Sequence, residues 1–170
     1  MEVYFVKTPE TPSQHLSGEA GKPIPKKAIR APEALSEAYR YAKPSSFSRA
    51  LRIDLKGITI LFISGTASVD ENGRSVHIGD FRGQTCRTYR NITALLAAEG
   101  ATWKDVVRTT CYLRDIERDY EAFNEIRTDF FREQGLDPLP ASTGIQAILC
   151  RPELLVEIDA IAICESDRKA

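Results

Sequence analysis

The feature that most constrains this chain is an apolar stretch near its C-terminus, residues 154–163, with the sequence LLVEIDAIAI. Successive side chains of an extended strand point to opposite faces, so Glu157 and Asp159 share a face, together with Leu155, Ile161 and Ile163. An ionised carboxylate is costly to bury unless it is paired, hydrogen-bonded or open to a wet cavity. The stretch therefore predicts a buried strand and indicates where chemistry could take place.

Hydrophobic periodicity predicts the other elements. Strands are expected over residues 47–55, 58–63, 106–113, 143–150 and 154–164. A helix is expected from its cap at Asp80 to about Glu99, just before Gly100. Its inner side would carry Cys86, Tyr89, Ile92, Thr93 and Leu96. A second helix stops at Gly135 and carries Tyr120, Phe123, Ile126, Phe130 and Phe131.

This order of elements predicts an α+β fold in which both helices lie on one face of a single mixed sheet. The second face of the sheet is also apolar in part, and no helix remains to cover it. A large exposed apolar face is typical of an interface between proteins. The pattern therefore predicts self-association.

The N-terminal region has a different composition, with six of the chain's nine prolines before residue 46. Such a segment favours extended or turn structure, although one short helix would fit over residues 31–41. The chain is thus expected to consist of a proline-rich arm at residues 1–46, an α+β domain at residues 47–165 and a polar tail at residues 166–170.

Composition excludes several classes of function. The net charge of -1 gives no electrostatic case for binding nucleic acid or an anionic membrane. No apolar run approaches the roughly 20 residues of a membrane span, and the N-terminus does not resemble a secretory signal. The four cysteines form no C-x-x-C pair and are expected to be reduced, mostly in the core, in a cytoplasmic protein. With two histidines, neither a metal site nor another cofactor is expected.

Short motifs over about residues 47–163 resemble the Rid (YjgF) superfamily. In chain order they are residues 63–65 (ISG), residues 105–110 (DVVRTT), Tyr120-x-x-Phe123-Asn124, residues 139–141 (LPA) and residues 156–162 (VEIDAIA). The resemblance implies a chorismate-mutase-like fold and a homotrimer with clefts between its subunits. It also implies cofactor-free hydrolysis of reactive enamines and imines, such as 2-aminoacrylate, to 2-keto acids and ammonia.

The family pattern is matched at some site positions and not at others. Its cleft serine corresponds to Ser64 and its last-strand glutamate to Glu157, whereas its cleft tyrosine corresponds to Phe47. In the family, an arginine soon after the Pro-Ala dipeptide binds the substrate carboxylate in a bidentate manner. Here Ser142 and Thr143 follow that dipeptide, so the arginine is missing.

A second resemblance is more local. Residues 46–50 (SFSRA), residues 62–68 (FISGTAS) and the pair Gly79-Asp80 look like the C-terminal half of chorismatases, which hydrolyse an enol ether and release pyruvate. Their key acid is a last-strand glutamate at the position of Glu157. This resemblance suggests Arg49 as the carboxylate anchor, although an arginine on a strand is usually solvated or paired.

The leading hypothesis is an enzyme that acts on a small carboxylate metabolite, with Glu157 as general acid and base. Arg49, Ser64 and Phe47 would bind the substrate, and Thr143 and Gln146 would line the cleft. Asp159 is expected to be a structural partner. Alternatively, Glu157 forms an ion pair with an arginine of a neighbouring subunit, and Ser64 satisfies local backbone. The rival functions are non-catalytic metabolite binding and, less favoured, ribonuclease activity.

Overall fold

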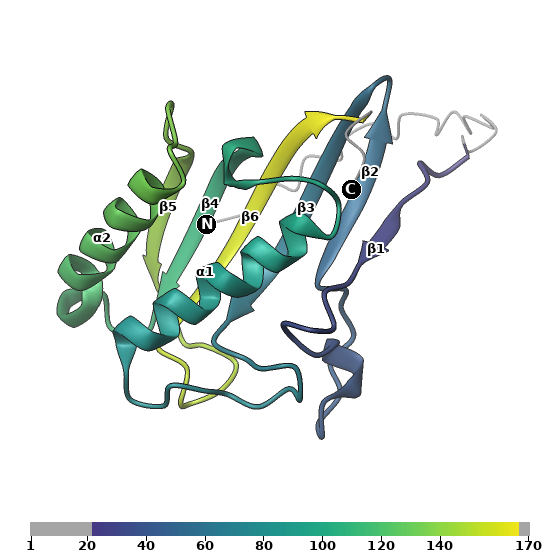
Figure 1. Ribbon diagram of the computed structural model, residues 1–170. Helices are drawn as coiled ribbons and strands as arrows, with labels where there is room; N and C mark the ends of the chain where they lie inside the picture. Colours follow the sequence, from purple (N-terminus) through teal and green to yellow (C-terminus); the bar gives the residue numbers. More distant parts are fainter. Residues whose placement is uncertain (1–21, 167–170) are drawn as a thin grey trace, which may run out of the picture.

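The computed structural model describes residues 22–166 as a six-stranded sheet with two helices (Figure 1). The strand order is β1-β2-β3-β6-β4-β5. The elements are β1 (Lys27–Ile29), β2 (Ala50–Leu55), β3 (Ile58–Ala67), α1 (Phe81–Ala97), β4 (Val106–Leu113), α2 (Ile116–Glu133), β5 (Ala141–Gln146) and β6 (Val156–Glu165). No helix within residues 22–166 is long and apolar enough to cross a membrane.

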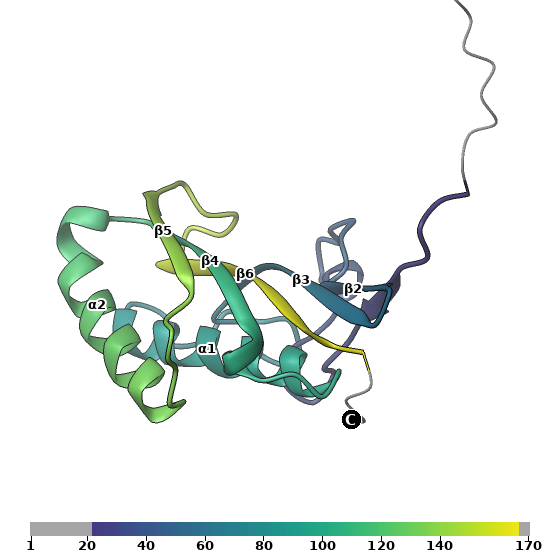
Figure 2. The same ribbon diagram turned by 90° about the horizontal axis from the view of Figure 1, so that it is seen from above.

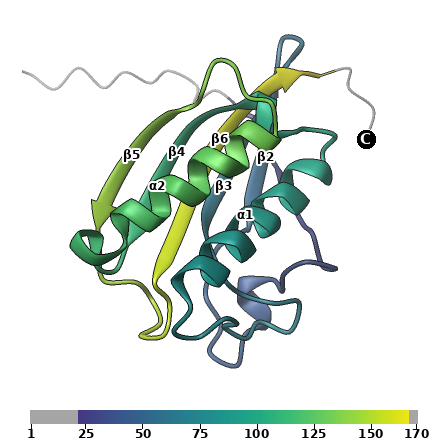
Figure 3. The same cartoon turned by 60° about the vertical axis from the view of Figure 1, so that its left-hand side comes forward.

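The predicted α+β class is confirmed. Strands β4 and β5 run parallel, whereas the other pairs are antiparallel, so the sheet is mixed. Figures 1 and 3 show α1 and α2 across the sheet, and in Figure 2 both lie on the same side of it. Within residues 22–166, no α-helix lies on the opposite face of the sheet.

Strand β6 alternates as predicted. Its inward residues Val156, Ile158, Ala160 and Ala162 are buried in the core beneath the helices. Glu157, Asp159 and Ile161 are half-buried, and Ile163 is exposed, because these side chains point to the open face. The two carboxylates therefore lie on the face that the helices leave uncovered.

Both helices begin at aspartates that cap them. Asp80 Oδ1 accepts a hydrogen bond from the Gly83 amide at 2.9 Å, and Asp115 Oδ1 accepts one from the Arg118 amide at 3.1 Å. Each bond satisfies an amide that has no partner within its helix.

The predicted inner side of α1 is confirmed for Tyr89, Ile92 and Leu96, which are buried, but it is wrong for Cys86 and Thr93, which are exposed. Polar side chains are buried there instead, including Gln84, Thr88 and Asn91. The amide of Asn91 donates to the carbonyls of Ala67 and Val69 at 3.0 and 2.8 Å. The side of α1 that faces the sheet thus binds backbone at the end of β3 and just after it, as well as apolar side chains, and the apolar pattern did not mark these polar positions.

Several strand boundaries also differ from the prediction. β3 continues to Ala67, four residues beyond its predicted end, and β2 begins only at Ala50. β5 spans Ala141–Gln146 instead of residues 143–150, because its partner β4 ends at Leu113. The following residues form the loop that leads to β6.

The helix expected over residues 31–41 is wrong. The segment makes one turn after Ala31 and a 3-10 helix at Ala38–Arg40. Between them, the Ser36 amide donates to the Asp70 carbonyl, and the Ser36 carbonyl accepts from Arg49, so these groups bond across the fold rather than along a helix. Of the expected arm and tail, residues 1–21 and 167–170 lie outside the described residues.

The described part of that region contributes to the core. β1 pairs with β2, and the side chains of Ile29, Leu35 and Ala38 are buried. The Lys27 ammonium forms an ion pair with the buried Glu99 carboxylate at 2.9 Å. The segment that leads from β1 to β2 then passes over the open face of the sheet, where it forms one wall of a cavity.

Candidate functional site

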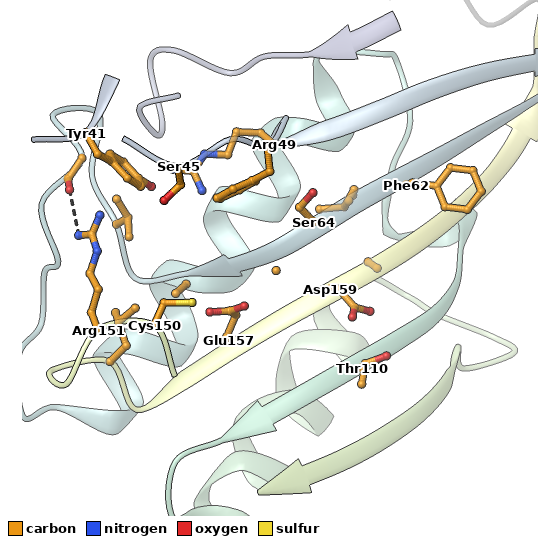
Figure 4. Close-up of a pocket in the computed structure, with 18 of the residues that line it drawn as sticks. Tyr41, Ser45, Arg49, Phe62, Ser64, Thr110, Cys150, Arg151, Glu157 and Asp159 are labelled. Carbon is orange, nitrogen blue, oxygen red and sulfur yellow. Dashed lines mark hydrogen bonds between the residues drawn. The ribbon is translucent and has the colours of Figure 1, made fainter. Parts of the chain in front are cut away.

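A cavity of about 1160 Å³ lies on the open face of the sheet (Figure 4). Its floor comes from β3, β4 and β6, and its walls come from the segment 41–49 and the loop 150–154. Small-molecule sites in proteins typically span roughly 300–1,000 Å³, so this cavity has ample room for a small metabolite.

A bulge in β3 shapes the floor next to Glu157. Ile63 pairs with Ala160 and Thr66 with Ile158, so two residues, Ser64 and Gly65, lie opposite one residue of β6. A bulge of this kind bends the strand and is common beside active sites. A Cβ atom on Gly65 would come within 2.1 Å of Glu157 Oε1. The carboxylate thus occupies the space that glycine leaves open.

The environment of Glu157 favours its protonated form. Its carboxylate accepts no hydrogen bond from the described residues. Burial, followed by the negative charge of Asp159, raises the pKa of the Glu157 carboxyl above its usual value, and the Arg49 cation opposes the shift only in part. A carboxyl group of this kind can donate a proton closer to neutral pH than an ordinary glutamate can.

Asp159 has the structural partner that was expected of it. The Tyr112 hydroxyl donates to Asp159 Oδ2 at 2.9 Å. This bond is the main reason why the pKa of Tyr112 is raised. Asp159 therefore accepts a hydrogen bond from a neighbouring strand, and its negative charge raises the pKa of Glu157 without direct contact.

Arg49 lies at the cavity but is almost completely buried, with 3% of its surface exposed. Its Nε and Nη2 atoms both donate to the Ser36 carbonyl, at 2.8 and 2.7 Å. Its guanidinium lies over the rings of Tyr41 and Phe47, at 5.1 and 5.4 Å from their centroids. Burial lowers the pKa of Arg49 to about 10, so it remains a cation at neutral pH.

The other predicted site residues are placed as follows. Phe47 is 41% exposed and lines the cavity. Ser64 also lines it, with a hydroxyl that donates to the Ser48 carbonyl at 2.8 Å. Thr143 and Gln146 lie on β5 outside this cavity. Thr143 accepts a hydrogen bond from Arg108, and the Gln146 side chain accepts one from the Ile116 amide at the start of α2.

The cavity wall includes residues that were not predicted as site residues, among them Tyr41, Cys150 and Arg151. Cys150, one of the four cysteines expected mostly in the core, is exposed because its loop lies above the sheet. Their position in the sequence could have indicated these loop residues. Residues 150–153 directly precede the strand that carries Glu157, so their side chains would be expected to lie near its first residues. Within residues 22–166, no three His, Cys, Asp or Glu side chains are grouped as metal ligands.

Comparison with known proteins places the chain among related sequences. The sequence model of the family described as endoribonuclease L-PSP matches residues 41–164. The chain is 35% identical over 107 residues to the 3-aminoacrylate deaminase RutC of Acinetobacter baylyi, covering 63% of this chain and 81% of that protein. It is 30% identical over 119 residues to a RutC family protein of Pyrococcus abyssi, covering 70% and 87%.

Solved structures with the same fold include YyfA of Yersinia pestis, described as a protein of the conserved Rid family. It shares 28% identity with a TM-score of 0.66, over 81% of this chain and 98% of that one. The YjgF gene product of E. coli shares 25% identity with a TM-score of 0.64, over the same shares of the two chains.

Proposed function

The chain belongs to the endoribonuclease L-PSP (YjgF/Rid) family, and on this premise we propose that it hydrolyses the enamine or imine of a small carboxylate. The observation that carries the proposal is the position and pKa of the Glu157 carboxyl group. This group lies above Gly65 in the cavity, and its pKa is raised. The name of the Acinetobacter relative, a 3-aminoacrylate deaminase, supports a substrate whose carbon–carbon double bond carries both an amine and a carboxylate.

In the proposed reaction, protonated Glu157 donates its proton to the enamine carbon, and the nitrogen lone pair forms the C=N bond of an iminium ion. The Glu157 carboxylate then accepts a proton from a water molecule that attacks the iminium carbon. The resulting carbinolamine expels ammonia. One water molecule is consumed, and one oxo acid and one ammonia are released, so no cofactor takes part.

The proposed roles of the other residues follow from their positions. Ser64 and Phe47 position the substrate against the floor and wall of the cavity. Two nitrogens of the Arg49 guanidinium, Nε and Nη2, already donate to the Ser36 carbonyl. Arg49 would therefore act mainly through its positive charge rather than through hydrogen bonds to the substrate. Thr143 and Gln146 would take part only if their edge strand β5 lined the site of a neighbouring subunit.

We further propose that the chain forms a homotrimer. The open face of the sheet is apolar away from the carboxylates, with Leu55, Ile58, Phe62 and Ile163 each 40–47% exposed. Apolar faces of this kind mark interfaces. Light scattering should give three times the 19.0 kDa mass of one chain, and the mass of a single chain would contradict the trimer.

Two other functions are supported by particular residues. An enol ether substrate is favoured by the chorismatase-like segment around Phe47 and Arg49, which forms one wall of the cavity. Non-catalytic binding of a metabolite is favoured by Ser142 at the position where the family has its arginine. Ribonuclease activity, which the family description suggests, finds no support in the net charge of -1.

The test offers 2-aminoacrylate, generated in situ, and chorismate to the purified chain and follows ammonia and pyruvate separately. Ammonia released faster than in buffer would support the proposal. Pyruvate from chorismate without ammonia would replace it with enol ether hydrolysis. Binding of a 2-oxo acid with no turnover of either compound would replace it with metabolite binding.

Gly65→Ala should separate the position of the carboxylate from the stability of the fold. The new methyl group would displace the Glu157 carboxylate, and misplacement of a catalytic group by about 1 Å can cost on the order of 100-fold in rate. The melting temperature should change little for two reasons. The nearest clashing atom is the end of a flexible side chain, and the φ angle of Gly65 does not lie in the left-handed region that favours glycine.

Gly144→Ala is the matched control, since its methyl group would meet only Tyr120 at 3.6 Å, an ordinary contact outside the cavity. It should retain full activity. Full activity of a folded Gly65→Ala protein would show that the observed position of the Glu157 carboxylate is not needed for turnover.

A further inference from the structure

The ring of Tyr41 lies between two arginines in the cavity wall. The Arg151 guanidinium lies 4.5 Å from the ring centroid, and the Arg49 guanidinium lies 5.1 Å from it. Aromatic faces attract cations, so the tyrosine holds two guanidinium groups close together. Figure 4 shows Tyr41, Arg49 and Arg151 at the same end of the cavity.

The surrounding backbone is built to hold this arrangement. A Cβ atom on Gly73 would come within 2.6 Å of the Tyr41 ring, so the close approach of the ring requires glycine there. The Gly73 carbonyl also accepts a hydrogen bond from Arg151 Nη1 at 2.9 Å, and Ser75 Oγ accepts another from the same atom at 3.1 Å. The Ser75 hydroxyl in turn donates to Glu153 at 2.7 Å.

The two arginines differ in the donors that remain free. Arg49 is buried and spends Nε and Nη2 on the Ser36 carbonyl. Arg151 is half-buried and spends only Nη1, so its Nε and Nη2 atoms have no hydrogen-bond partner among the described residues. These two nitrogens form the edge of the guanidinium that binds a carboxylate through two parallel hydrogen bonds.

The acidic groups of the cavity do not outweigh the basic ones: the lining carries Lys43, Arg49, Arg108 and Arg151 against Glu153, Glu157 and Asp159. Asp159 is bound to the Tyr112 hydroxyl. Glu153 is bound to Ser75, and this bond is the main reason why the pKa of Glu153 is lowered. Lys43 adds a further positive charge to the lining. The wall therefore offers net positive charge and a free planar donor edge, which suit one small anionic group.

We infer that Arg151 binds the carboxylate of the substrate through its Nε and Nη2 atoms, in place of the arginine that is missing after Pro140-Ala141. The ring of Tyr41 packs against the Arg151 guanidinium and helps to hold it in place. Arg151 precedes Glu157 by six residues, and Figure 4 shows both side chains around the same cavity, so a ligand anchored at Arg151 would extend toward the acid. This inference rests on the proposed function for the identity of the ligand as a small carboxylate.

The test measures binding without turnover, by calorimetry with sodium pyruvate and with its neutral methyl ester. Arg151→Met should weaken binding of pyruvate by about 10- to 100-fold, the range for a lost hydrogen-bonded charge, and should leave binding of the methyl ester unchanged. Arg151→Lys should fall between the two proteins, because lysine keeps the charge but loses the planar fork. Arg132→Met, an exposed control whose arginine pairs with Asp129, should bind pyruvate like the wild type.

Several results would overturn the inference. The first is that the wild-type protein does not bind pyruvate. The second is that a folded Arg151→Met variant binds pyruvate with unchanged affinity. The third is that Arg151→Met weakens binding of pyruvate and of its methyl ester equally. The last result would mean that Arg151 only holds its loop in place. Failure of the proposed function is distinguishable: pyruvate binding that depends on Arg151, without ammonia release, would retain the carboxylate site and reject the deaminase.

Discussion

Glu157→Gln is expected to lower the rate of ammonia release by about 10²- to 10⁴-fold, the usual contribution of a general acid and base. Glutamine matches the shape of glutamic acid but cannot deliver the proton to the enamine carbon or take one from water. Since it fits above Gly65 as the carboxyl group does, binding of pyruvate should persist. Glu165→Gln, an exposed residue at the end of the same strand, is the matched control and should retain full activity.

The same substitution should not destabilise the fold at neutral pH. The pKa of Glu157 is raised in the folded chain, so the wild type loses stability as pH rises through that pKa. The neutral glutamine avoids this loss. Glu157→Gln should therefore be at least as stable as the wild type, with a larger advantage at pH 8 than at pH 4. A variant less stable than the wild type at pH 8 would indicate instead that Glu157 forms an ion pair.

Trp103→Ala is expected to lower the free energy of unfolding by about 3–5 kcal/mol, the range for removing a large buried aromatic side chain. Trp103 is 1% exposed, and its ring packs against Tyr89 on α1 and against Phe130 and Phe131 on α2. Its Nε1 atom donates to Thr93 Oγ1 at 2.8 Å. The substitution leaves a cavity where the two helices meet.

Urea unfolding at one protein concentration would measure this effect, with Trp103→Phe and Thr93→Val as controls. Phenylalanine keeps part of the ring volume and should cost less than alanine. Thr93→Val removes the hydroxyl that accepts from the indole N–H and donates to the Tyr89 carbonyl, and it should cost about 1–3 kcal/mol, the penalty for leaving the buried indole N–H unpaired. If Trp103→Ala lowered the free energy of unfolding by less than Thr93→Val does, the result would contradict a central packing role for Trp103 in this cluster.

The sequence was most informative where one strand or helix carries its own pattern. Alternation along β6 correctly divided Glu157 and Asp159 from Val156 and Ile158, because each side of the sheet has a distinct environment. The Asp80 cap correctly marked the start of α1, because capping depends only on the next few residues. Such local signals do not depend on how the elements meet.

Tertiary contacts decided what the sequence left open. Ser36 bonds to Asp70 and Arg49 rather than along a helix, so the proline-rich segment has turns where a helix was expected. The same holds for the site. Glu157, Arg49, Ser64 and Phe47 all line the cavity, yet Tyr41 and Arg151 were missed, because two distant loops bring them together. Hydrophobic periodicity within one segment does not predict a contact between two distant loops.

The most direct test of the acid role is the pKa of the Glu157 carboxyl in the intact wild-type protein. It can be measured as the pH-dependent carboxyl signal that disappears in Glu157→Gln, by infrared difference spectroscopy or by NMR of protein with labelled glutamate. The structure predicts a pKa above the ordinary value of 4.5. A pKa at or below 4.5, as an ion pair with an arginine of a neighbouring copy would produce, would contradict the account of Glu157 as the acid of this site.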